Sequence, residues 1–220
     1  MQLDDFLVLM DKLLGEDGCP WDKEQTHESL RPYLLEECYE TIDAIDKRDM
    51  HSLKEELGDV LLQVVFHAKL AEKAGIFSMA DITRGVADKL ISRHTHVFGS
   101  DIATSADDVV KVWEANKQKE RAHSPLEAMR DVPKALPGLV RAAKVLKRSG
   151  EDKPSIIQLC DDIASAVKGL ANAKSEQNDL FGNILLKMVN LSAILEINPE
   201  FSLTNAVEGF INTKCKNSRI

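Results

Sequence analysis

The sequence predicts an all-α protein, and three observations lead to this prediction. Leu, Ala, Glu and Lys, which favour helices, are plentiful, whereas only 5% of the 220 residues are aromatic. Apolar residues recur at three- and four-residue steps, which is the spacing of one helix face. We find no segment with the apolar–polar alternation of a half-buried strand. With 44% hydrophobic residues, such helices can bury a core.

The first half of the chain is expected to form five helices. Leu3, Phe6 and Leu7 begin the apolar stripe of the first helix, which Gly15 should end. The turn between the second and third helices, residues 48–52, is short enough to make these helices antiparallel neighbours. The five predicted ranges are 3–14, 30–47, 53–74, 80–94 and 107–123.

A segment that contains three prolines is predicted to divide the chain. Residues 124–138 are the densest proline stretch, so we expect a linker there between one domain at 1–123 and another at 139–220. The second domain is also expected to be helical. Its predicted helices are 139–148, 155–173 and 180–197, with a weak tail helix after residue 202.

The second half of the chain contains a degenerate copy of part of the first. Residues 56–65 align without gaps on residues 180–189, with the apolar positions and one glycine retained. The acids of the first copy are Glu37, Glu40, Glu56 and Asp59, and their counterparts are Asp162, Ser165, Leu180 and Asn183. Charge follows the same division, because residues 1–123 carry 25 acidic and 15 basic side chains whereas residues 124–220 carry 11 and 13. We therefore expect the acids to act in the first half.

Composition also limits the partners and the compartment of the protein. A net charge of −8 provides no basic surface for a nucleic acid or an anionic membrane, so neither partner is expected. The longest apolar stretch, residues 60–68, is too short to span a bilayer. The N-terminal residues lack the features of a secretion signal, and the four scattered cysteines are typical of reduced thiols. These features predict a cytoplasmic protein.

Four acids of the first half are candidate metal ligands. On the helix over 30–47, Glu37 and Glu40 fall at the edge of the apolar stripe. The helix over 53–74 is apolar nearly all round, yet Glu56 and Asp59 share one face of it with Gln63. Two carboxylates about 4 Å apart repel by about 4 kcal/mol at an effective dielectric constant of about 20. Facing acids therefore need a cation, and oxygen ligands suit Mg²⁺, or Mn²⁺ in its place.

These acids have two other interpretations. The first is a solvated helix face, which is the usual role of an acidic run and our expectation for Glu36, Asp43 and Asp46. The second is a di-iron carboxylate bundle, which requires a Glu-x-x-His pair on each of two helices. The sequence has one such pair, Glu24 and His27, in an expected loop, so this interpretation is weak.

The acidic pattern resembles the signature of a known family. Glu-Glu-x-x-Glu at 36–40 followed by Glu-x-x-Asp at 56–59 is similar to the MazG signature of the all-α nucleoside triphosphate pyrophosphohydrolases. Further blocks resemble MazG and together cover most of residues 1–150. These blocks are Cys19-Pro-Trp-Asp-Lys-Glu-Gln-Thr-His27, Arg93-His-Thr-His-Val-Phe98, Trp113-Glu-Ala-Asn-Lys117 and Pro133-Lys-Ala-Leu-Pro-Gly-Leu-Val-Arg141.

This resemblance implies a fold and an activity. The first half would be a four-helix-bundle-like MazG module that forms a homodimer, and the second half a degenerate helical module. The enzyme would cleave a nucleoside triphosphate to nucleoside monophosphate and pyrophosphate, as in removal of unwanted nucleotides from the pool. Glu37, Glu40, Glu56 and Asp59 would hold the metal ion, and Glu37 or Glu40 would position or deprotonate the water that attacks the α-phosphorus.

Basic and aromatic residues supply candidate substrate contacts. Lys89 and Arg93 lie one helical turn apart, and the resemblance places a basic pair there to meet the phosphates. Their counterparts in the second copy are Gly209 and Thr213, so this pair is lost together with the acids. Trp21 is a candidate to stack on a nucleobase or, as we slightly prefer, to hold its loop against the bundle.

Base preference stays open at this point, because no motif reads the edge of a nucleobase. Trp113 is expected in the core. Two functions without turnover also stay open, namely a nucleotide-binding regulator and a helical interaction module.

Overall fold

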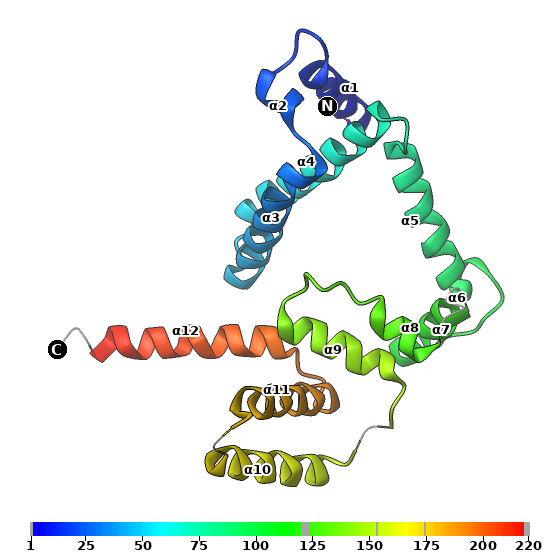
Figure 1. Ribbon diagram of the computed structural model, residues 1–220. Coiled ribbons are helices and arrows are strands. Elements are labelled where there is room, and N and C mark those ends of the chain that lie inside the picture. The colour runs from blue at the N-terminus through cyan, green and yellow to red at the C-terminus, as the bar shows by residue number, and fades with distance from the viewer. Residues whose placement is uncertain (1, 120–123, 153, 174, 218–220) are drawn as a thin grey trace. The chain divides into compact units, whose positions relative to one another are not determined.

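The computed structural model describes residues 2–119, 124–152, 154–173 and 175–217. Within these ranges the chain forms twelve helices and no strand (Figure 1). The predicted all-α class is confirmed. Contacts divide the chain into two compact units, residues 1–120 and 121–220, and each unit is described by itself.

The first unit is built around a long antiparallel hairpin of two helices, α3 and α4. Its helices are α1 (Leu3–Leu14), α2 (Pro20–Glu24), α3 (His27–Lys47), α4 (Met50–Lys73), α5 (Met79–Arg93), α6 (Thr95–Phe98) and α7 (Ala106–Lys119). In this unit α3 and α4 share the most extensive contact, and α1 packs against α4. The short helices α2 and α6 fall in segments that we predicted as loops.

Side-chain caps explain why α3 and α4 begin three residues earlier than predicted. Thr26 accepts a hydrogen bond from the backbone N–H of Ser29, and the Ser29 hydroxyl accepts one from the N–H of Thr26. Asp49 accepts hydrogen bonds from the backbone N–H groups of His51 and Ser52. The turn between the helices is reduced to Arg48 and Asp49, which fixes the antiparallel register.

The core of the first unit lies where α1 meets the far end of the hairpin. Met10, Leu30, Val65 and Phe66 are buried together, with at most 4% of each residue exposed. Gly75 ends α4 with a φ of +68°, a conformation that favours glycine. The predicted end of this helix, residue 74, directly precedes this glycine.

The second unit repeats a helical pair of the first. Its helices are α8 (Pro125–Arg130), α9 (Gly138–Ser149), α10 (Ile156–Asn172), α11 (Gln177–Ile194) and α12 (Pro199–Asn217). Residues 124–138, predicted as a linker, contain α8, because Pro125 occupies the first turn and Ser124 caps it. Helix α8 packs on α9, and α10 packs on α11 as α3 packs on α4.

The described helices differ in length and composition from a membrane span. None of them is long and apolar enough on its own to cross a bilayer. Helices α11 and α12 reach that length and composition only when taken together, and they meet at a bend of 104°.

Candidate metal centre

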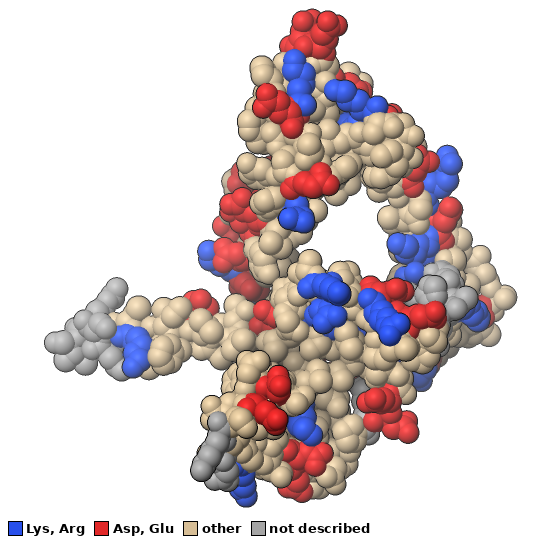
Figure 2. Space-filling view, in the orientation of Figure 1, with Lys and Arg blue, Asp and Glu red and all other residues tan. Residues whose placement is uncertain are grey.

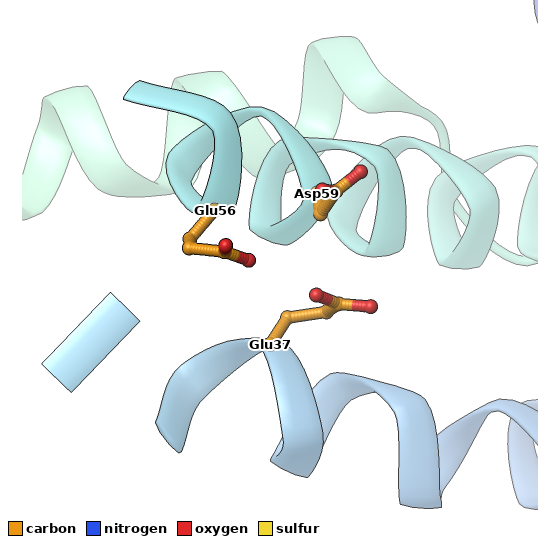
Figure 3. Close-up of side chains that lie close together, drawn as sticks. All are labelled: Glu37, Glu56 and Asp59. Carbon is orange, nitrogen blue, oxygen red and sulfur yellow. The ribbon is translucent and has the colours of Figure 1, made fainter. Parts of the chain in front are cut away.

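The α3–α4 hairpin brings three predicted ligands together from its two helices. Glu37 on α3 faces Glu56 and Asp59 on α4, and one carboxylate oxygen from each lies within 4.8 Å of the others. Figure 3 shows Glu37 and Glu56 projecting into the space between the helices, with Asp59 beside them on α4. The arrangement follows from the sequence, because Glu56 and Asp59 are three residues apart on one helix face. The short turn then sets Glu37 opposite that face.

Glu40, the fourth predicted ligand, lies beside this cluster but outside the group within 4.8 Å. It is exposed, one turn from Glu37 toward the hairpin turn. It lines, with Asp43, Asp49 and Glu56, a hollow at that end of the hairpin, and its negative charge raises the pKa of Glu56. Glu40 therefore lies next to the group of three carboxylates and is not part of it.

Repulsion between the carboxylates and their partial burial disfavour the ionisation of all of them at once. Burial raises the pKa of Glu37, and the negative charges of Asp59, Glu40 and Glu56 raise it further. The pKa of Glu56 is raised by partial burial, by Glu40 and by Asp59. A divalent cation removes this penalty, because it attracts the ionised form of every member.

The donor chemistry fits a hard divalent cation. Carboxylate oxygens from two helices with one exposed side leave room for water and phosphate oxygens, which is the pattern of Mg²⁺ sites. Figure 2 shows acidic side chains gathered along the flank formed by α3 and the start of α4. Asp43 is exposed and pairs with Lys47 at 2.6 Å, which is the geometry of a solvated helix face.

The degenerate copy in the second unit places a lysine near its remaining carboxylate. Asp162, the counterpart of Glu37, lies 4.0 Å from the ammonium group of Lys187 and accepts a hydrogen bond from Gln158. Lys187 is the counterpart of Gln63. The lysine charge lies close enough to offset part of the negative charge of this carboxylate.

The structure does not bring the predicted phosphate contacts onto the hairpin. Lys89 and Arg93 lie on α5, which leaves the end of α4 and runs away from the carboxylates (Figure 1). Lys89 is exposed, whereas the guanidinium carbon of Arg93 lies 5.4 Å from the ring centre of Trp113. Trp113, predicted in the core, is half-buried and also meets His94 edge to face.

Trp21 lies on α2 and contacts the hairpin through an aromatic neighbour that sequence reasoning missed. The residue is 51% exposed, and its ring meets the ring of Tyr33 edge to face, with 6.0 Å between the ring centres. The Gln25 side chain donates to the backbone carbonyl of Trp21 and accepts from the Ser29 hydroxyl. This chain of hydrogen bonds fixes α2 against the first turn of α3.

Two polar residues of α4 were also missed as candidates. Gln63 is only 6% exposed, and its side-chain oxygen is buried with no hydrogen-bond partner in the described part of the chain. His67 has a buried Nε2 without a partner, while its Nδ1 lies 2.7 Å from Nδ1 of His27. His27 therefore faces His67 and not a metal site with Glu24. The four-residue spacing of Asp59, Gln63 and His67 indicates that these polar side chains share one face of the helix.

Comparisons with known proteins give a consistent match. Residues 25–98 match the family model of the MazG nucleotide pyrophosphohydrolase domain. The chain is 39% identical over 213 residues to the nucleoside triphosphate pyrophosphohydrolase/pyrophosphatase MazG of Thermotoga maritima, an alignment that covers 94% of this chain and 82% of that protein. It is 38% identical over 224 residues to the nucleoside triphosphate pyrophosphohydrolase of Escherichia coli K12, covering 95% and 84%. A crystal structure of a MazG-related protein from Thermotoga maritima matches with a TM-score of 0.45 and 24% identity, over 52% of this chain and 98% of that one.

Proposed function

Because the chain belongs to the MazG family of nucleoside triphosphate pyrophosphohydrolases, we propose that it hydrolyses a nucleoside triphosphate to the monophosphate and pyrophosphate with Mg²⁺, or Mn²⁺ in its place. Glu37, Glu40, Glu56 and Asp59 would hold the ion. The observation that carries this proposal is the convergence of Glu37, Glu56 and Asp59 across the α3–α4 hairpin. We also propose that the enzyme is a cytoplasmic homodimer that removes unwanted nucleotides.

The carboxylates have two separate tasks in this proposal. When bound, Mg²⁺ supplies positive charge at the phosphate oxygens. Asp59 and Glu56 serve as ligands, while Glu37 or Glu40 accepts the proton of the attacking water. The partial burial and neighbouring charges that raise the pKa of Glu37 support it as the acceptor, because a carboxylate with a raised pKa binds a proton more strongly.

The substrate phosphates are assigned to the basic pair on α5. Lys89 and Arg93 would neutralise the charge that develops on the phosphate oxygens. Within one chain these residues lie away from the carboxylates. The assignment therefore requires α5 to contact a nucleotide that is bound at the carboxylates of another chain. The homodimer is the arrangement in which we place that contact.

The test is pyrophosphate release from ATP, GTP, CTP and UTP with Mg²⁺ and with EDTA. Glu56→Gln and Asp59→Asn should each lower the rate by about 100-fold or more, because each removes charge from the metal centre. Asp162→Asn is the matched control, since it changes the counterpart of Glu37 in the degenerate copy and should leave the rate within about twofold. Nucleotide binding without turnover in the unaltered protein would support a regulator and contradict the proposal.

A further inference from the structure

The α3–α4 hairpin is held at its two ends by different contacts. At the turn, Asp49 caps α4 by accepting two backbone hydrogen bonds, and only Arg48 and Asp49 connect the helices. At the opposite end, Nδ1 of His27 on α3 lies 2.7 Å from Nδ1 of His67 on α4. The three carboxylates of the metal centre lie between these two ends. Their separation therefore depends on how each end is held.

The bond between the two histidines constrains the helices in a way that the nearby apolar core does not. Leu30, Val65 and Phe66 are buried at this end, but apolar contacts are non-directional, so they leave the helices some freedom to slide. A hydrogen bond weakens steeply when its length or angle departs from the ideal. His27 lies in the first turn of α3, and Nε2 of His67 is buried in the interior. Their bond therefore ties the start of α3 to a fixed level of α4.

Distances along α3 indicate how a change at the histidines would reach the carboxylates. Glu37 is 11 residues from Arg48 at the turn, or about 16 Å at the helical rise, whereas His27 is 21 residues from it, or about 31 Å. If the start of α3 moved by about 1 Å with the turn as the pivot, Glu37 would move by about half that distance. Mg²⁺ requires near-ideal octahedral geometry, with ligand distances within about 0.2 Å of their usual values. A shift of about 0.5 Å is therefore large enough to weaken metal binding.

We propose that His27 and His67 are positioning residues for the metal centre. Their bond holds the start of α3 against α4 and thereby sets the distance of Glu37 from Glu56 and Asp59 across the hairpin. Neither histidine touches the ion, because each acts through the helix that carries it. This inference rests on the proposed function and adds two residues that decide how tightly the carboxylates bind the ion.

The competing explanation is that the histidine pair contributes to stability alone, while the apolar core sets the register of α3 on α4. Loss of the bond would then lower the free energy of unfolding but leave the metal affinity of the folded protein unchanged. Leu30→Val separates the two explanations. It removes one carbon from a buried residue three positions after His27, so it destabilises this end of the hairpin while both histidines stay.

The experiment measures the dissociation constant of Mn²⁺ by electron paramagnetic resonance at pH 7.5, on variants that circular dichroism shows to be folded. Loss of a group that orients a metal ligand commonly weakens metal binding about 10- to 100-fold. Because the histidines act through helices, we expect a smaller loss, of about fivefold or more, in His27→Leu and in His67→Phe. His27→Asn keeps a hydrogen-bonding group near the position of Nδ1, so its affinity should stay within about twofold of the unaltered protein. Leu30→Val should also stay within about twofold.

Crystal structures of the metal-free unaltered protein and of metal-free His27→Leu supply a second measurement, which needs no ion. The distance between the Cα atoms of Glu37 and Asp59 should differ between the two structures by about 0.5 Å, as the helical geometry predicts. His27 is exposed, so this variant should fold.

The outcomes that overturn the positioning role differ from those that overturn the proposed function. An unchanged Mn²⁺ affinity in His27→Leu, or an equal loss in Leu30→Val or His27→Asn, would overturn the positioning role. An unchanged Cα distance would also overturn it, whether or not the ion binds. If the unaltered protein takes up no Mn²⁺, the metal centre of the proposed function fails. The two crystal structures then decide the positioning role by themselves, and the expected change in the Cα distance supports it.

Discussion

His27 and His67 share one hydrogen bond between their Nδ1 atoms, which are 2.7 Å apart. The ring planes are within 7° of parallel and the ring centres are 5.0 Å apart. Stacked rings cannot bring two atoms this close, because carbon atoms in contact lie about 3.5–4.0 Å apart. The rings therefore lie edge to edge in nearly one plane, with one nitrogen donating and the other accepting. This bond joins the first turn of α3 to the C-terminal half of α4.

The His27–His67 bond predicts that the protein loses stability at mildly acidic pH. Burial lowers the pKa of His67 below its ordinary value of 6.5, and the neighbouring His27 lowers it further. At His67 the unfolded chain then binds more protons than the folded chain below about pH 6.5, so the contribution of this residue to the free energy of unfolding should fall as the pH decreases from 7.5 to 5.5. His67→Phe should flatten this dependence. Urea unfolding at both pH values measures it, and an equal pH dependence in the variant would contradict the assignment.

The metal centre illustrates which features a sequence can predict. The three-residue spacing of Glu56 and Asp59 and the short turn near residue 48 were enough to place Glu37 opposite them, because both are local properties. The contacts of Trp21 with Tyr33 and of His27 with His67 were not predictable in the same way. Each joins residues of different helices, and each depends on a register that only the assembled helices define.

Helix ends and the direction of α5 show a second limit of prediction from sequence. Periodicity located α3 and α4 but missed their first turns, because His27 to Ser29 and Met50 to Ser52 are held by caps and not by apolar contacts. Lys89 and Arg93 were predicted as phosphate contacts from their spacing along one helix together with the family resemblance. How α5 leaves α4 depends on backbone angles near Gly75, which spacing does not encode.

The Asp49 cap should make a measurable contribution to stability. Asp49 accepts two backbone hydrogen bonds at the start of α4 and a third from the Ser52 hydroxyl. Asp49→Ala should therefore lower the free energy of unfolding by about 1 kcal/mol. Asp43→Ala, which removes only an exposed pair with Lys47, should change it by less than about 0.5 kcal/mol. Chemical denaturation of both variants checks this, and equal losses would argue against the cap.

The core at the end of the hairpin should be much more sensitive than its outer face. Leu30 is 1% exposed and packs with Met10, Val65 and Phe66. Leu30→Ala should cost about 2–5 kcal/mol, because the cavity left among these side chains cannot collapse completely. Leu35→Ala is the control, since Leu35 on the same helix is 57% exposed. Its effect should be below about 1 kcal/mol in the same denaturation experiment, and similar losses in the two variants would place the core elsewhere.

Metal binding should couple to stability through the same carboxylates that repel one another. Without divalent cations, Glu37 has a raised pKa, so the folded protein takes up a proton there more readily than the unfolded chain, and this contribution to stability is lost as the pH rises. Mg²⁺ should restore stability at pH 7.5, by about 2.7 kcal/mol at 100 times its dissociation constant. At pH 5.5 protons compete with the ion at Glu37 and Glu56, so the gain should be smaller.

Glu56→Gln should melt at a higher temperature than the unaltered protein in EDTA, because one repelling charge is gone, and its melting temperature should rise less on addition of Mg²⁺. Thermal melts at both pH values, with and without Mg²⁺, measure these effects, and a gain in Glu56→Gln as large as in the unaltered protein would place the ion outside the hairpin.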